Sequence, residues 1–268
     1  SCFSTWLSFW RPHTERTEKM NVLTVEGLTK RYSGFALEDV SFVLGEGRIM
    51  GLIGRNGAGK TTTLKSILGM IKPQGGRITV LGHELPGGEA ACKQEMGVVL
   101  GGIDFYMQKR LSDITSATRR FYPAWDAGAY SRHMARFGLD EHKRVNELSA
   151  GMRVKYLIAL ALSHGAGLLI LDEPTSGLDP VSRDELLELL RHLADSRGIS
   201  VLFSTHITSD LDKCADDITY IKDGRVLASG DKATFARHFL HLRQPGETGE
   251  LSLEEIMLRT ERRTYDDF

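Results

Sequence analysis

Cysteine is scarce in this sequence, and its three residues are too far apart to form a recognisable site. Cys2, Cys92 and Cys214 are odd in number and include no C-x-x-C pair. This spacing excludes a disulfide framework and the common zinc motifs. The same scarcity indicates a compartment that keeps thiols reduced.

Long apolar runs are also lacking, and neither sign of charge dominates. No stretch approaches the roughly 18 consecutive apolar residues of a membrane-spanning helix, so another chain would have to supply any span. With 34 Lys and Arg against 35 Asp and Glu, the net charge is −1. A dedicated nucleic-acid-binding protein normally carries a basic stripe, so no nucleic-acid partner is expected, although this balance does not exclude a local patch.

What is present is the composition of an ordinary globular protein, 41% hydrophobic and 26% charged. The 268 residues suffice for one large α/β domain with an inserted subdomain. Residues 1–19 are aromatic and then polar, and too interrupted for a secretory signal. Two interpretations remain for them: a leader ahead of a start at Met20, which we favour, or a short interfacial anchor whose Trp side chains contact lipid headgroups.

One stretch fits the phosphate-loop pattern G-x-x-x-x-G-K-[ST] in its required context. An apolar run at residues 48–53 predicts a buried strand before it, and helical spacing over 61–70 predicts a helix after it. Backbone N–H groups of such a loop surround an anion at the helix N-terminus. Lys60 would reach the β- and γ-phosphates, and the Thr61 hydroxyl would bind Mg²⁺. The predicted nucleotide-binding residues are Gly54, Arg55, Asn56, Gly57, Ala58, Gly59, Lys60, Thr61 and Thr62.

Short apolar runs bounded by turn residues predict further strands, and the continuous ones are typical of a parallel sheet. These strands are expected at residues 22–25, 40–44, 77–82, 97–100, 168–171 and 199–203. A hairpin turning at Asp223-Gly224 is expected within 216–230. Helices are expected at 181–193 and 252–259, and residues 106–164 are helix-rich, which indicates an inserted helical subdomain.

Two acids follow the apolar strand at 168–171, where a P-loop protein needs a metal-binding carboxylate. Asp172 fits that role, and Glu173 fits a general base for an attacking water. A surface carboxylate capping a turn is the simpler alternative for Glu173. His206 ends another strand at the same predicted sheet edge and could donate a hydrogen bond to a γ-phosphate oxygen, although a lone His is more often structural.

Two further features have both a structural and a functional interpretation. Ser149 is placed to cap a helix whose first residues, Ala150 and Gly151, leave N–H groups accessible to a second phosphate. Taken alone, an ordinary helix cap is the simpler explanation. The polar loop expected at residues 29–35 carries two aromatic residues, Tyr32 and Phe35, which could either pack locally or form a platform for a flat base.

The order of these motifs resembles the ATP-binding subunit of an ABC transporter. The resemblance covers residues 22–230 and rests on five segments: the P-loop, Leu148–Met152 as the signature, Leu168–Glu173 as Walker B, Ser176–Asp179 as the D-loop, and His206 as the H-loop. It implies a P-loop NTPase fold with a mostly parallel core sheet, an antiparallel β subdomain and an inserted helical subdomain. The implied division is an extension at 1–19, an ATPase domain at 20–232 containing the helical insertion at 98–165, and a tail at 233–268.

The resemblance also implies the chemistry and the partners. Two such subunits would pair head to tail as a homodimer or heterodimer, with ATP and Mg²⁺ between the P-loop of one and Ser149, Ala150, Gly151 and Asp179 of the other. Tyr32 matches the aromatic residue that stacks on adenine. A separate transmembrane permease would be the second partner, which places the chain in the cytoplasm, peripheral on the inner face of the membrane.

Two segments, 121–126 and 160–164, resemble a bacterial exporter group that includes ATPases encoded beside GntR-type regulators and exporters of phenol-soluble modulins, so peptide or antimicrobial export is expected. Three positions depart from the family: Ala150 replaces Gly, Met152 replaces Gln, and Gly101 stands at the Q-loop glutamine. Asp104 or Gln108 could substitute for that glutamine. Slow basal hydrolysis, or tighter dependence on the permease, is the resulting hypothesis.

Two alternatives belong to other classes of protein. A soluble ABC ATPase of DNA repair or translation would usually show coiled-coil insertions, zinc motifs or a second cassette, and this sequence has none of them. A regulatory ATP-binding module that barely hydrolyses would suit Gly101 and Met152, but Asp172, Glu173 and His206 argue against it.

Overall fold

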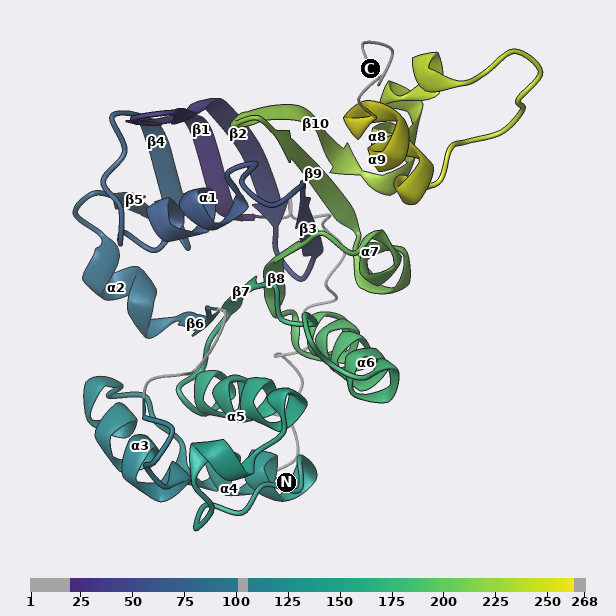
Figure 1. The fold of residues 1–268 in the computed structure, drawn as a ribbon. Helices are drawn as coiled ribbons and strands as arrows, with labels where there is room; N and C mark the ends of the chain where they lie inside the picture. Colours follow the sequence, from purple (N-terminus) through teal and green to yellow (C-terminus); the bar gives the residue numbers. More distant parts are fainter. Residues whose placement is uncertain (1–19, 101–105, 263–268) are drawn as a thin grey trace, which may run out of the picture.

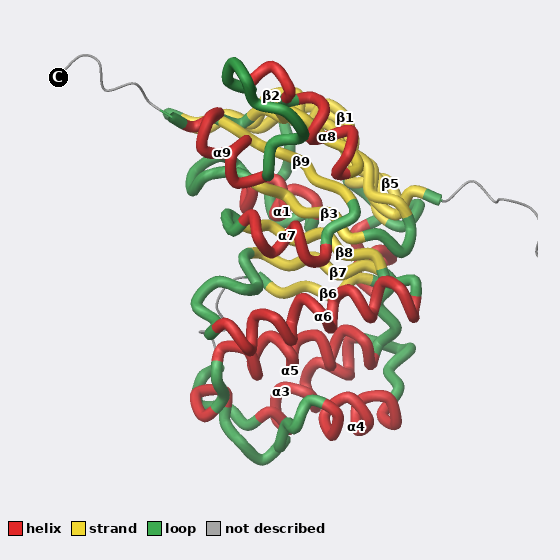
Figure 2. The backbone as a smooth tube through the Cα atoms, turned by 90° about the vertical axis from the view of Figure 1, so that its right-hand side faces the viewer, coloured by secondary structure: helices red, strands yellow, loops and turns green. Residues whose placement is uncertain are grey.

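The computed structural model describes residues 20–100 and 106–262. The expectations for residues 1–19, Gly101 and Asp104 therefore lie outside the described residues. Within the described part, two sheets are stacked at one end of the molecule, and a group of helices occupies the other end (Figures 1 and 2).

The smaller sheet is antiparallel and has the strand order β2-β1-β4-β5. Its strands are β1 (Asn21–Tyr32), β2 (Phe35–Gly45), β4 (Gly75–Val80) and β5 (His83–Leu85). The loop expected at 29–35 is wrong: β1 and β2 continue through it as a hairpin, with Tyr32 paired to Phe35 and Gly34 in the turn at φ 100°. Exposed strand ends are polar, so their sequence resembles a loop.

The larger sheet has six strands in the order β10-β9-β3-β8-β7-β6, and only the β9–β10 pair is antiparallel. Its strands are β3 (Ile49–Ile53), β6 (Met96–Val99), β7 (Leu168–Asp172), β8 (Ser200–Thr205), β9 (Asp217–Lys222) and β10 (Arg225–Asp231). All residues of β3, β7 and β8 are buried, which explains their continuous apolar sequences.

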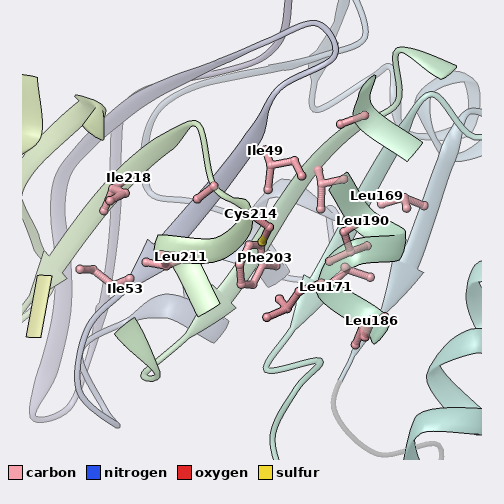
Figure 3. Packing of buried hydrophobic residues seen from close by; sticks show 14 of the residues in the cluster. Ile49, Ile53, Leu169, Leu171, Leu186, Leu190, Phe203, Leu211, Cys214 and Ile218 are labelled. Atoms are coloured by element: carbon pink, nitrogen blue, oxygen red, sulfur yellow. The ribbon is translucent and has the colours of Figure 1, made fainter. Parts of the chain in front are cut away.

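Alternate residues of the central strands face two different apolar clusters. In β8, Val201 and Phe203 pack with α6 (Pro180–Arg197) and α7 (Thr208–Cys214), whereas Leu202 packs with α1 (Lys60–Ile67) and β1. Figure 3 shows the first cluster around Phe203. The sheet is thus covered on both faces, and its strand ends are held firmly in place.

The helical group lies beyond β6 and consists mainly of α3 (Leu111–Thr118), α4 (Ala127–Arg136) and α5 (Ala150–Ser163) (Figure 2). The Thr115 hydroxyl lies 2.9 Å from Tyr130 Oη and 2.8 Å from Tyr156 Oη, so one buried hydrogen-bond network joins all three helices. Short 3₁₀ turns at Arg119–Phe121 and Val145–Glu147 connect them. The helix-rich character expected for residues 106–164 is present.

Several short helices have no clear signal in the sequence. They are α2 (Glu89–Gln94), α7 and α8 (Lys232–His238), none longer than seven residues. Helical periodicity is judged over windows of about 11–18 residues, so helices of this length are not detected.

The region expected as a tail packs against the first apolar cluster. Phe235 of α8 and Ile256 of α9 (Leu253–Glu261) are 1% and 0% exposed, and a 3₁₀ turn at Leu240–Leu242 lies between the two helices. Each buried side chain of this size stabilises the fold by roughly 1.5–3 kcal/mol. The division into 20–232, with 98–165 inserted, and 233–268 stays a prediction.

Candidate nucleotide-binding site

A cavity of about 540 Å³ opens at the turn between β3 and α1. Residues of the P-loop, of the β1–β2 turn and of the β7 edge line it: Gly34, Phe35, Arg55, Asn56, Gly57, Gly59, Lys60, Thr61, Thr62 and Glu173. Most of the predicted nucleotide-binding residues therefore surround one hollow. Ala58 is 6% exposed and supports the loop from behind.

Two glycines allow the P-loop to pass close to Ile221 and Leu37. Gly54 has φ 156°, and a Cβ there would lie 2.2 Å from the Ile221 carbonyl oxygen. Gly59 has φ 115°, and its Cβ would lie 2.5 Å from Leu37 Cδ2. Only glycine adopts such φ values beside packed neighbours without strain. Gly59 also caps α1 without a side-chain hydrogen bond, so no capping side chain occupies the first N–H groups of the helix.

Lys60 supplies the positive charge of the cavity. Its side chain is 6% exposed, and Nζ donates to the carbonyl oxygens of Gly54 at 2.7 Å and Arg55 at 3.3 Å. Nζ also lies 3.3 Å from Glu173 Oε1. A buried ammonium held by carbonyl oxygens and a carboxylate suits an anionic ligand, because the phosphate oxygens would add acceptors for the same cation.

Thr61 and Asp172 meet as the sequence predicts for a metal site. Thr61 Oγ1 donates to Asp172 Oδ2 at 2.9 Å, and Ser204 Oγ donates to Oδ1 at 2.5 Å, which fixes the carboxylate. In the described part of the chain, no group of three or more His, Cys, Asp or Glu side chains is placed to hold a metal ion. A hydroxyl beside a single carboxylate is instead the pattern that fits Mg²⁺, which takes its other ligands from water and phosphate.

Glu173 and His206 come together although 33 residues separate them. His206 Nδ1 donates to Glu173 Oε2 at 2.8 Å. The Glu173 backbone is at φ 50°, and its N–H is bonded to Ser204 Oγ at 3.0 Å. Non-glycine residues rarely adopt such φ values, and the surrounding bonds hold this one there. The three predicted catalytic residues, Lys60, Glu173 and His206, thus form one cluster.

The two aromatic residues expected to form a platform, Tyr32 and Phe35, lie differently relative to the cavity. Tyr32 is 46% exposed, has Lys30 Nζ 5.6 Å from its ring centroid, and is not among the residues that line the cavity. Phe35, its partner across the hairpin, does line the cavity. The hairpin register places Phe35 beside the P-loop, where a Cβ on Gly59 would lie 3.0 Å from Phe35 Cζ. The role of Tyr32 as the residue that stacks on adenine stays a prediction.

The signature residues lie elsewhere. Ser149 caps α5 by accepting a hydrogen bond from Met152 N at 3.2 Å, and Asp179 caps α6 by accepting from Ser182 N at 3.0 Å. These two helix starts adjoin, since a Cβ on Gly151 would lie 3.3 Å from Ser182 Cβ. Both views place α5 and α1 on opposite sides of strands β6–β8 (Figures 1 and 2). Ala150 and Gly151 occupy the first turn of α5.

Sequence reasoning also missed a buried acid beside the H-loop. Asp210 is 0% exposed and accepts hydrogen bonds from Thr175 Oγ1 at 2.6 Å and Arg183 Nε at 2.5 Å. It thereby ties the segment after Glu173 to α6 and to the helix that follows His206. Gln108, a suggested Q-loop substitute, instead accepts from Arg144 Nη1 at 3.4 Å within the helical group.

Comparison with known proteins shows the family to which this chain belongs. Residues 37–176 match the family model described as "ABC transporter". A solved "Structure of ATP binding subunit of ABC transporter" superimposes with a TM-score of 0.77 at 29% identity, over 90% of this chain and 100% of that one. Another, "cbiO1 from clostridium perfringens: Part of the ABC transporter complex cbiONQ", gives a TM-score of 0.67 at 25% identity, over 85% and 97% of the two chains. The chain belongs to the ABC transporter family.

Curated relatives refine the class to the ATP-binding subunit. "Nod factor export ATP-binding protein I" of Ralstonia nicotianae is 34% identical over 81% of this chain and 69% of its own length. "Bacitracin transport ATP-binding protein BcrA" of Bacillus licheniformis is 32% identical over 77% and 68%. The chain is therefore an ABC transporter ATPase that binds nucleotide, and the α/β P-loop fold expected from the sequence is confirmed.

Proposed function

We propose that this chain is the ATP-hydrolysing subunit of a bacterial ABC exporter that moves peptides or antimicrobial compounds. The observation that carries the proposal is the Lys60–Glu173–His206 cluster at a P-loop cavity, in a chain whose relatives are export and transport ATP-binding proteins. Described residues include no helix long and apolar enough to span a membrane. The proposed partner is a transmembrane permease on a separate chain, with this subunit peripheral on the cytoplasmic face.

In this proposal the P-loop binds the triphosphate of ATP through its N–H groups and Lys60. Mg²⁺, held by the Thr61 hydroxyl and Asp172, would neutralise charge on the β- and γ-phosphates. Glu173 accepts the proton of the attacking water, and His206 holds the Glu173 carboxylate at the correct angle through its 2.8 Å hydrogen bond. The short distances among these groups support a hydrolysing enzyme over a module that only binds ATP.

The second half of the site would come from a partner subunit. Ser149 and the first turn of α5 form a capped helix N-terminus, which attracts anions, and α5 lies on the opposite side of strands β6–β8 from α1, the helix that follows the P-loop (Figure 1). Head-to-tail pairing would place this N-terminus on the γ-phosphate held by the partner's P-loop. ATP would close such a dimer, and hydrolysis would release it.

A hollow in the helical group supports docking of the permease. It has a volume of about 540 Å³ and is lined by Tyr106, Lys109, Asp113, Ile114, Ala117, Thr118, Phe121 and Tyr122. Phe121 is 73% exposed, an unusual position for a large apolar side chain. An apolar rim with one Lys and one Asp suits an amphipathic helix from the permease.

Copurification from membranes tests the permease and its docking surface. We expect the tagged chain to retain a transmembrane protein, and Phe121→Asp to lose it while the ATPase rate of the isolated chain is unchanged. Leu258→Asp is the matched control, because Leu258 is 63% exposed on α9, and α9 and α3 lie at opposite ends of the molecule (Figure 1). Recovery of the chain without any membrane protein would favour the non-transport ATPase. Peptide accumulation in cells that produce the Glu173→Gln variant would support export.

A further inference from the structure

The C-terminal helix α9 ends against the outer wall of the P-loop. A second cavity, of about 400 Å³, lies between them, lined by Arg55, Asn56, Gly57, Ala58, Lys222, Asp223, Glu261 and Arg262. Arg55, Asn56 and Gly57 also line the nucleotide cavity. These three P-loop residues therefore lie between the two cavities. Nucleotide is expected in one cavity, and the end of α9 lines the other.

Two hydrogen bonds attach the end of α9 to strand β9. Tyr220 Oη donates to Glu261 Oε1 at 2.8 Å, and Lys222 Nζ donates to the Thr260 carbonyl oxygen at 2.7 Å. Burial raises the pKa of Tyr220 above its usual range, so the phenol keeps its proton and remains a donor. The Glu261 side chain is only 16% exposed, which makes this a sheltered, charge-assisted bond.

The remaining Glu261 oxygen faces the P-loop. Oε2 lies 3.9 Å from Arg55 Nη1, and the Arg55 side chain is 58% exposed. Strand β9 and its hairpin touch the same loop, because Gly224 N donates to the Ala58 carbonyl oxygen at 3.0 Å and Ile221 adjoins Gly54. The helix, the hairpin and the loop thus form one chain of contacts that ends at the phosphate-binding N–H groups.

We propose that Glu261 is a positioning residue for the P-loop, and that α9 acts as the external support that holds the loop ready for nucleotide. Because a preordered loop loses less conformational entropy when it binds, removing the support weakens ATP binding. The hydrolytic groups Asp172 and Glu173 lie on the β7 side of the cavity, so the catalytic step stays intact. The inference rests on the ATPase class alone and does not depend on the cargo or the permease.

The test is steady-state ATPase kinetics of the full 268-residue chain with Glu261→Gln and Glu261→Ala. Glu261→Gln keeps an acceptor for Tyr220 but removes the attraction to Arg55, and we expect KM for ATP to rise about two- to five-fold, the range of an exposed ion pair. Glu261→Ala, which also removes the Tyr220 bond, raises KM further. In both variants kcat stays at the unmodified value.

Glu254→Gln is the matched control, because it removes the same charge from the exposed first turn of α9 and leaves KM unchanged. Thermal unfolding of every variant separates loss of fold from loss of positioning. If Glu261→Ala does not fold, Glu261→Gln still carries the test.

A double-mutant cycle with Arg55→Ala decides whether the two side chains act together. We expect the double variant Arg55→Ala/Glu261→Gln to have the KM of Arg55→Ala alone, because the Glu261 effect passes through Arg55. Additive effects, an unchanged KM in Glu261→Gln, or a fall in kcat at constant KM would each overturn the inference. None of these results bears on whether the chain serves an exporter.

Discussion

The P-loop and the start of α5 both present a helix N-terminus, but their surroundings differ. At the P-loop, Gly59 caps α1 without a side chain. Lys60 and Glu173 line the same cavity, and the Thr61 hydroxyl, which also lines it, donates to Asp172. At α5, Ser149 uses its own hydroxyl as the cap, and the adjoining element is another helix start at Asp179. The first region has the groups for phosphate chemistry, whereas the second has only a dipole and N–H donors. The P-loop region can therefore bind and polarise a phosphate, and we propose that the start of α5 completes the site of a partner subunit.

The largest effect should come from the catalytic carboxylate on the P-loop side. We expect Glu173→Gln to lower kcat by roughly 10²–10⁴, the usual loss when a general base is removed. ATP binding should persist, so size-exclusion chromatography should show an ATP-stabilised dimer. Glu188→Gln, an exposed acid on α6, is the control that should change neither property. Hydrolysis at the unmodified rate in Glu173→Gln would show that Glu173 is not the base.

A smaller effect, on binding itself, should follow loss of the P-loop cation. Lys60→Ala removes a hydrogen-bonded charge that contributes about 1.5–3 kcal/mol, so ATP affinity should fall about 10- to 150-fold. Equilibrium titration with a fluorescent ATP analogue measures this. Lys65→Ala, in the last turn of the same helix, should bind ATP normally. Equal losses in both variants would mean that the helix, rather than the Lys60 charge, had failed.

Helices α5 and α9 both begin with a serine cap, and only the cap of α5 is proposed to contact a nucleotide. Ser149→Ala and Ser252→Ala each remove a serine that accepts at 3.2 Å from the third helical N–H, so each should lose about 1 kcal/mol of stability. Only Ser149→Ala should also lower the ATPase rate, about ten-fold, by weakening the phosphate contact across the dimer. Its binding of ATP as a monomer should stay normal. Equal ATPase rates in the two variants would contradict the dimer role of α5.

The smallest expected effect is a dependence of folding stability on pH, which arises in the helical group that contains α5. Burial lowers the pKa of His133 from its usual 6.5, so the unfolded chain binds this proton more readily than the folded one. The stability contributed by neutral His133 is therefore present above pH 6.5 and is lost as pH falls towards the lowered pKa. Thermal unfolding between pH 7.5 and 5 should show this slope. The slope should decrease in His133→Leu, and it should stay unchanged in the control His142→Leu, which alters an exposed histidine of the same region.

Much of the fold was predictable because its signals are local. Continuous apolar runs indicated β7 and β8, since both faces of the sheet are covered, and Asp223-Gly224 indicated the β9–β10 hairpin. The end of β1 was missed because its polar side chains face water. Asp210 was missed because an acid four residues after His206 has no sequence signal that distinguishes it from a surface residue.

The sequence by itself determined the P-loop, because its nine consecutive residues from Gly54 to Thr62 contain the glycines, the cation and the hydroxyl that a phosphate needs. It also determined the class of protein through the order of the motifs. Only the tertiary structure decided that His206 contacts Glu173, that Ser204 fixes Asp172, and that Glu261 lies beside Arg55. The physical reason is distance along the chain: strand order and helix packing bring these partners together, and no local pattern encodes them.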